Sequence, residues 1–102
     1  MNYVDILKKI KDNLITLEEI NELECPDINK VILQYAYYEW NKMDFAISKL
    51  LKDAKGRFAE SSDHLRIIKQ LIERTRQKSK FFDIELFERI LISLYSSDTI
   101  LS

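Results

Sequence analysis

The presence of only one glycine and one proline in 102 residues most constrains what this chain can fold into. Both residues are far rarer here than in an average globular protein. Sheet proteins need many tight turns, and those turns are built mostly from Gly, Pro, Asn and Asp. Helical bundles need fewer turns, so the scarcity predicts an all-α protein. Because 46% of the residues are apolar, the chain can bury a core, and its length predicts a single helical domain over residues 1–102.

Apolar residues at three- and four-residue spacings predict the helices of a bundle. Thr16 and Glu19 have the spacing of a capping box. Pro26 marks the start of the next helix, with the Asp27 carboxylate as its cap. No helix breaker follows before Gly56, so we expect one long central helix of about 43 Å. The last two segments form either separate helices or one continuous or kinked helix. The prediction is a bundle of four to five helices, over residues 3–13, 17–23, 27–55, 62–79 and 82–95.

Charge and cysteine content narrow the class of protein. The net charge is −1, but residues 1–51 carry −3 and residues 52–102 carry +2. This mild asymmetry suits docking to other proteins at least as well as binding to nucleic acid. Cys25 is the only cysteine, so no intrachain disulfide can form, which predicts a reducing, cytoplasmic setting. No apolar run reaches the roughly 18 residues of a membrane span, and the N-terminus does not have a signal-peptide pattern.

No pattern in the sequence predicts catalysis, a metal site or a cofactor. A cysteine nucleophile needs a histidine partner, and His64, the only histidine, lies in another segment beside Asp63 and Arg66. Glu18 and Glu22 share one helical face and could in principle hold a cation. Without a histidine or a second inward-facing carboxylate pair, a solvated acidic face is the better interpretation. A lone glycine cannot form a phosphate-binding loop. We therefore expect a protein that is not an enzyme.

Two groups of residues are candidates for binding. The first is an aromatic group with residues of the last helix, because Tyr, Trp and Arg are enriched at interface hot spots. The predicted protein-interface residues are Tyr35, Tyr37, Tyr38, Trp40, Phe87 and Arg89. The second group is a basic segment that predicts contacts with nucleic-acid phosphates. Its residues are Arg66, Lys69, Arg74, Arg76, Lys78 and Lys80. Core packing is the alternative for the aromatic group, and a solvated face or interface rim is the alternative for the basic segment.

The stretch LECPDINKVILQY resembles a hallmark of the helical domain of archaeal GINS DNA replication subunits. In that family a leucine and a proline-containing turn precede an aspartate, an apolar residue and a helix with valine and tyrosine about one turn apart. The matching positions are Leu23, Pro26, Asp27, Ile28, Val31 and Tyr35. The proline sits one place from its usual position, and Ile28–Asn29 replaces the usual aromatic pair. The final segment resembles the helix that closes the GINS helical domain, with Glu88, Arg89, Ile90 and Leu91 as the equivalents.

This resemblance implies a non-catalytic scaffold. GINS subunits assemble through their helical domains into a tetramer, which bridges the MCM helicase and a RecJ- or Cdc-like partner at the replication fork. The long aromatic helix and the final helix would then be assembly surfaces of a homo- or hetero-oligomer. The alternative, which follows from the basic segment 66–80, is a small helical subunit of a CRISPR-type or viral ribonucleoprotein that binds RNA.

Overall fold

The structure of the chain is a computed structural model that describes residues 1–78 and 80–101, and the side chains of residues 1–78 and 80–93. The described residues form six helices and no strand, so the predicted all-α fold is confirmed. The helices are α1 (Tyr3–Lys11), α2 (Leu17–Asn21), α3 (Asp27–Trp40), α4 (Asp44–Arg57), α5 (Ser62–Thr75) and α6 (Ile84–Leu101).

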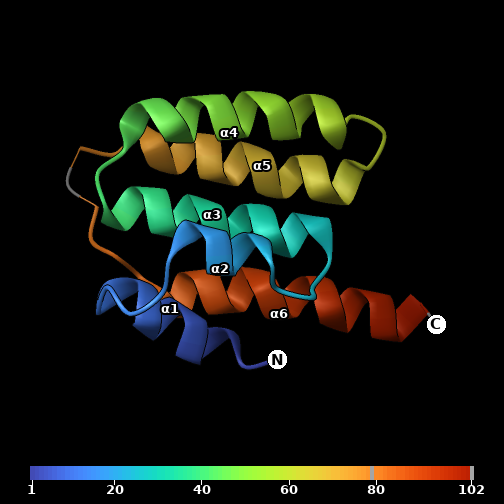
Figure 1. Cartoon of the computed structure of the whole chain (residues 1–102). Coiled ribbons are helices and arrows are strands. Elements are labelled where there is room, and N and C mark those ends of the chain that lie inside the picture. Colours follow the sequence, from blue (N-terminus) through green and yellow to red (C-terminus); the bar gives the residue numbers. More distant parts are fainter. Residues whose placement is uncertain (79, 102) are drawn as a thin grey trace.

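Helix α3 lies at the centre and packs against α1, α2, α4 and α6 (Figure 1). Helices α4 and α5 pack together on one side of α3, and α1 packs on α6 on the other side. The core therefore forms around α3, with side chains from both pairs of helices. The largest fully buried residues are Leu7, Ile10, Ile20, Val31, Ile32, Leu33, Tyr35, Ile68, Leu71, Phe87 and Leu91.

Side chains that cap the helices explain several of the helix starts. The predicted capping box is confirmed: the Glu19 N–H donates to Thr16 Oγ1 and the Thr16 N–H donates to Glu19 Oε1, each at 3.1 Å. Pro26 is the N-cap residue of α3, as its fixed φ favours. Asp27, however, makes no capping hydrogen bond, so its interpretation as a cap is wrong. Its carboxylate lies in the first turn of α3, where a negative charge is favourable at the positive end of the helix dipole.

The expected long central helix over residues 27–55 is wrong, because the chain turns sharply at Lys42. Lys42 has the left-handed φ of 57°. The turn is a Schellman motif, in which the Met43 N–H donates to the Tyr38 carbonyl at 2.9 Å and the Lys42 N–H donates to the Glu39 carbonyl at 3.1 Å. A continuous helix of about 43 Å would exceed the 36 Å length of the whole protein. The break instead lets α4 fold back and pack along α3.

The last two segments form separate helices rather than one kinked helix. Helix α5 ends at Thr75, before the expected residue 79, and α6 begins at Ile84 rather than at 82. The described part of the connection includes Phe81, whose carbonyl accepts a hydrogen bond from the Arg74 side chain at 2.6 Å. This contact holds the connection against the helical body. Within the described residues, no helix combines the length and the apolar character that crossing a membrane requires.

Candidate functional site

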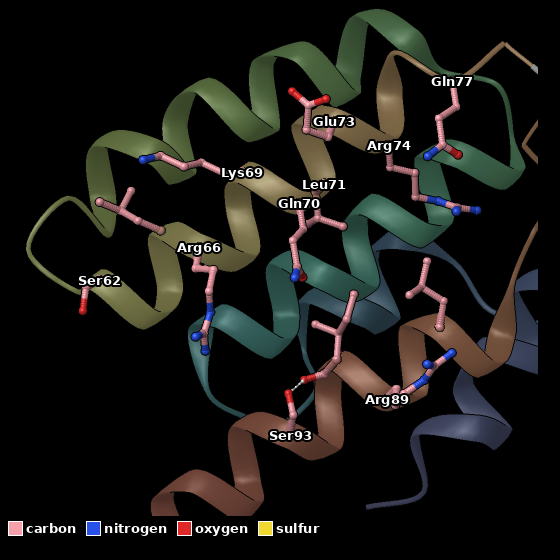
Figure 2. Close-up of a pocket in the computed structure, with 13 residues that line it drawn as sticks. Ser62, Arg66, Lys69, Gln70, Leu71, Glu73, Arg74, Gln77, Arg89 and Ser93 are labelled. Atoms are coloured by element: carbon pink, nitrogen blue, oxygen red, sulfur yellow. Dashed lines mark hydrogen bonds between the residues drawn. The ribbon is translucent and has the colours of Figure 1, made fainter.

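An open groove of about 890 Å³ runs between α5 and α6 (Figure 2). Its apolar surface comes from Leu65 and Leu71 on α5 and from Leu86 and Ile90 on α6. Arg66 and Gln70 project from α5 toward α6, and Arg89 and Ser93 lie on the opposite wall. The groove is therefore amphipathic, with apolar, polar and basic side chains in its lining. The other residues that line it are Ser62, Lys69, Glu73, Arg74 and Gln77.

The groove exists because α5 and α6 bury their apolar faces against different neighbours. Helix α5 packs on α4 and buries Ile67 and Ile68, whereas α6 packs on α1 and α3 and buries Phe87 and Leu91. One side of α5 and one side of α6 are thus left without a helix packed on them, and these two sides line the groove. Leu65, Leu86 and Ile90 on these sides are only half-buried, so apolar surface stays accessible to a partner.

A buried ion pair fixes one end of the groove. The guanidinium of Arg74 on α5 makes two parallel hydrogen bonds to the carboxylate of Glu39 on α3, with Nε–Oε1 at 2.8 Å and Nη2–Oε2 at 3.1 Å. The two side chains are only 10% and 7% exposed. Such a bidentate pair also fixes the relative orientation of the two helices. Because Arg74 also donates to the Phe81 carbonyl, one side chain joins α5, α3 and the connection to α6.

Two aromatic side chains complete the network around this ion pair. The Tyr35 hydroxyl donates to Glu39 Oε1 at 3.2 Å, and the Arg74 guanidinium lies over the Phe87 ring, 5.2 Å from its centroid. The Tyr35 and Phe87 rings themselves lie 5.9 Å apart. Burial, followed by the nearby Glu39 carboxylate, raises the pKa of Tyr35. The phenol therefore stays protonated at neutral pH and remains a donor.

The predicted nucleic-acid residues do not form one surface. Arg74 lies in the buried network. Its prediction as a surface contact for phosphates is therefore wrong, because its guanidinium is buried. Arg76 is exposed but forms an ion pair with Glu73 at 2.7 Å. Lys78 is exposed, and Lys80 is half-buried. Only Arg66 and Lys69 of this set lie beside the groove with their charges in solvent, and Arg66 also lies 3.7 Å from the exposed carboxylate of Asp63.

The predicted interface residues also divide. Tyr35 and Phe87 are fully buried, and this burial removes their side chains from the surface where a partner would contact them. Tyr37, Tyr38 and Trp40 are half-buried. Arg89 is exposed and lines the groove, on the wall opposite Arg66 rather than beside the tyrosines.

Sequence reasoning missed Glu39 and the apolar side chains of the groove. A signal for Glu39 was present, because it follows Tyr35 by four residues and therefore shares its helical face. No local sequence pattern indicates that α5 and α6 line the same groove, since this arrangement depends on which other helices each of them packs against. Two exposed aromatic residues were also missed, Phe45 at 80% exposed and Phe81 at 74% exposed.

Comparison with family models, with curated proteins and with solved structures finds no match for this chain. The resemblance to GINS subunits therefore rests only on the residues quoted for it. Several of these have structural roles in this fold: Ile28 and Val31 are buried, and Pro26 is the N-cap residue of α3.

Two further observations concern the chemistry of the site. In the part of the chain that the structure describes, no three His, Cys, Asp or Glu side chains gather where they could hold a metal ion. Burial, as the largest cause, raises the pKa of the Cys25 thiol. The thiolate fraction at neutral pH is therefore lower than that of a free cysteine.

Proposed function

We propose that this chain is a non-catalytic helical binding module whose α5–α6 groove accepts an acidic amphipathic segment of a protein. The observation that carries the proposal is the composition of the groove, in which the half-buried side chains Leu65, Leu86 and Ile90 share the lining with the exposed cations Arg66 and Arg89. An amphipathic helix with acidic residues beside its apolar face complements such a surface, since helix-in-groove recognition places apolar anchors in the groove and matches charges at its rim.

The size of the groove favours a macromolecular segment. A volume of about 890 Å³ is near the upper end of small-molecule pockets, but those pockets bury most of the ligand surface, whereas this groove is open along its length. The lining residues extend along α5 from Ser62 to Arg74 and then to Gln77 in the connection. At 1.5 Å per residue the helical part, from Ser62 to Arg74, is about 18 Å, or roughly three helical turns.

Protein is favoured over RNA by what the groove offers. Single-stranded RNA is held by aromatic side chains on which bases stack and by cations that follow the backbone. None of the described residues that line the groove is aromatic. Of the six basic residues predicted for RNA, Arg74 is committed to Glu39 and Arg76 pairs with Glu73. Of the remaining cations, Arg66 and Lys69 line the groove together with its apolar side chains, which suits a protein segment.

The GINS resemblance gives a narrower version of the same proposal. In that version the module would be an assembly subunit of a replication complex, and the segment in the groove would belong to another subunit. The main stretch that motivates it lies at the start of α3, but two of the matching positions in the final segment, Arg89 and Ile90, line the groove. The groove and the resemblance therefore share residues of α6, and both favour a scaffold.

The test is fluorescence anisotropy with two labelled probes, an amphipathic helical peptide of leucine and glutamate and a single-stranded RNA. We expect the peptide to bind and the RNA to bind at least tenfold more weakly at the same low salt. The variant Arg66→Glu/Arg89→Glu should lose at least tenfold in peptide affinity, which corresponds to about 1.4 kcal/mol.

The matched control is Lys49→Glu/Lys52→Glu, which makes the same charge change on exposed residues of α4 that do not line the groove. This control should keep most of the peptide affinity. An equal loss in both double variants would show that only net charge matters and would overturn the groove as the site. Tighter binding of the RNA than of the peptide would favour the ribonucleoprotein alternative.

A further inference from the structure

A second group of charged side chains lies outside the groove. Residues 12–29 contain six acidic residues and no lysine or arginine, whereas residues 66–80 contain six basic residues and one acidic residue. All six acidic side chains are exposed. The residues are Asp12, Glu18, Glu19, Glu22, Glu24 and Asp27. The acidic charge of the first half of the sequence is therefore concentrated in one stretch of exposed side chains.

The segment that contains these acidic residues also contains leucines that are exposed or half-buried. Leu14, in the turn between α1 and α2, is 70% exposed, and Leu17 at the start of α2 is half-buried. Glu18 and Glu22 are spaced by four residues and so lie on one face of this helical turn. Glu19 is held in the capping box, which leaves Glu18 and Glu22 as the carboxylates that are free to meet a partner. We call Leu14, Glu18 and Glu22 the acidic surface.

The acidic surface and the groove lie on opposite faces of the molecule. Helix α2 lies in front of α3 in Figure 1, whereas it lies behind α3 in Figure 2, which looks into the groove. Helix α2 packs on α3, and α5 packs on α4. One copy therefore cannot bring its own acidic surface into its own groove, but two copies can meet in this way.

We propose that the acidic surface of one copy docks in the α5–α6 groove of a second copy. This inference rests on the proposed function, since it names the segment that fills the groove. Leu14 would cover the apolar side chains Leu65 and Ile90, and Glu18 and Glu22 would meet Arg66 and Arg89. Among the described residues Arg89 forms no ion pair within the chain, and Arg66 makes only a long, solvent-exposed pair with Asp63 at 3.7 Å. Both guanidinium groups can therefore meet a partner.

Docking of this kind is head-to-tail, because each copy contributes a different surface. Such heterologous contacts produce rings when the rotation closes and open chains when it does not. The contact combines apolar burial with charge pairs that are exposed to solvent, so it should weaken as salt screens the charges. The expected result is self-association that rises with protein concentration and falls with salt.

Two variants that each block one surface test this proposal. The groove-blocked variant is Arg66→Glu/Arg89→Glu, and the acid-blocked variant is Glu18→Gln/Glu22→Gln. All four side chains are exposed, so circular dichroism should show both variants folded. In size-exclusion chromatography with light scattering at low salt, we expect wild type to exceed the monomer mass of 12.2 kDa. Each variant alone should be monomeric.

The decisive step is to mix the two variants. The acid-blocked copy retains an intact groove, and the groove-blocked copy retains an intact acidic surface, so the mixture should form a complex of twice the monomer mass and grow no further. Glutamine is used at the acidic surface because a lysine there could pair with the reversed groove. The same double variant of α4, Lys49→Glu/Lys52→Glu, should self-associate like wild type.

Three results would overturn the inference. The first is a wild type that stays monomeric at low salt and high concentration. The second is self-association that survives in both variants, which would place the contact elsewhere. The third is a mixture in which the two variants remain separate monomers. Failure of this inference is distinguishable from failure of the proposed function, because the groove would still bind the acidic peptide in the anisotropy experiment.

Discussion

The ion pair between Arg74 and Glu39 makes the most specific stability prediction of this structure. The substitution Glu39→Gln keeps the volume of the side chain and removes its charge, which leaves the guanidinium of Arg74 buried beside a neutral amide. Both side chains are at least nine-tenths buried. Removal of one partner from such a pair costs about 3–5 kcal/mol, because the remaining charge is desolvated without compensation. The total free energy of unfolding of a domain is about 5–15 kcal/mol, so this variant should lose a large share of its stability.

A double-mutant cycle separates this mechanism from a general loss of packing. Arg74→Met should also be strongly destabilising, because it leaves the Glu39 carboxylate buried and breaks the contact with the Phe81 carbonyl. The double variant Glu39→Gln/Arg74→Met contains neither charge and should recover at least about 2 kcal/mol relative to the sum of the single variants. The control is Asp53→Asn, which breaks the exposed Arg57–Asp53 pair and should change stability by less than about 1 kcal/mol.

The assay is urea unfolding followed by circular dichroism and by tryptophan fluorescence. Trp40 is the only tryptophan, and its ring lies 5.3 Å from that of Phe82, so its emission reports the docking of the α5–α6 connection on α3. Coincident transitions from both signals would justify a two-state analysis. Single-variant costs below about 1 kcal/mol, or costs that simply add in the double variant, would refute the argument that a desolvated charge pair holds the three elements together.

Three other substitutions test separate features. The pKa of Tyr35 is raised in the folded protein, so the unfolded chain loses this proton at a lower pH. The free energy of unfolding should therefore fall as the pH rises above the ordinary pKa of 10.0, by up to about 1.4 kcal/mol per pH unit. Tyr35→Phe should lack this extra dependence in urea unfolding, Tyr37→Phe should keep it, and identical profiles would contradict the assignment. Lys42→Gly should raise stability by about 1 kcal/mol, because glycine adopts the left-handed φ of 57° without steric cost; a loss of stability would contradict this reason. Gly56→Ala should raise the melting temperature through a gain of about 0.4–1 kcal/mol, since no atom outside the adjacent backbone of α4 lies within 4 Å of the added Cβ, and a lower melting temperature would indicate a clash.

The sequence by itself determined the fold class and the first residue of four helices, α1, α2, α3 and α5. The scarcity of glycine and proline favoured helices, and the capping box at Thr16 and Glu19 marked the start of α2 correctly, because these signals act within a few residues. The break at Lys42 was not predicted, since a lysine has no preference for the left-handed conformation. Asn41 and Asp44 flank the break and are residue types common in turns and at helix starts, but this signal is weak.

Only the tertiary structure decided which residues belong to the surface and which to the core. Tyr35, Phe87 and Arg74 have the residue types of binding hot spots, yet the packing of α3 against α6 and the bidentate contact with Glu39 bury all three. Arg66 and Arg89 lie far apart in the sequence, and they face the same groove because α5 and α6 each pack on other helices. Local patterns set where a helix begins and which of its faces is apolar. The choice of neighbours, which creates the groove, depends on contacts between distant segments.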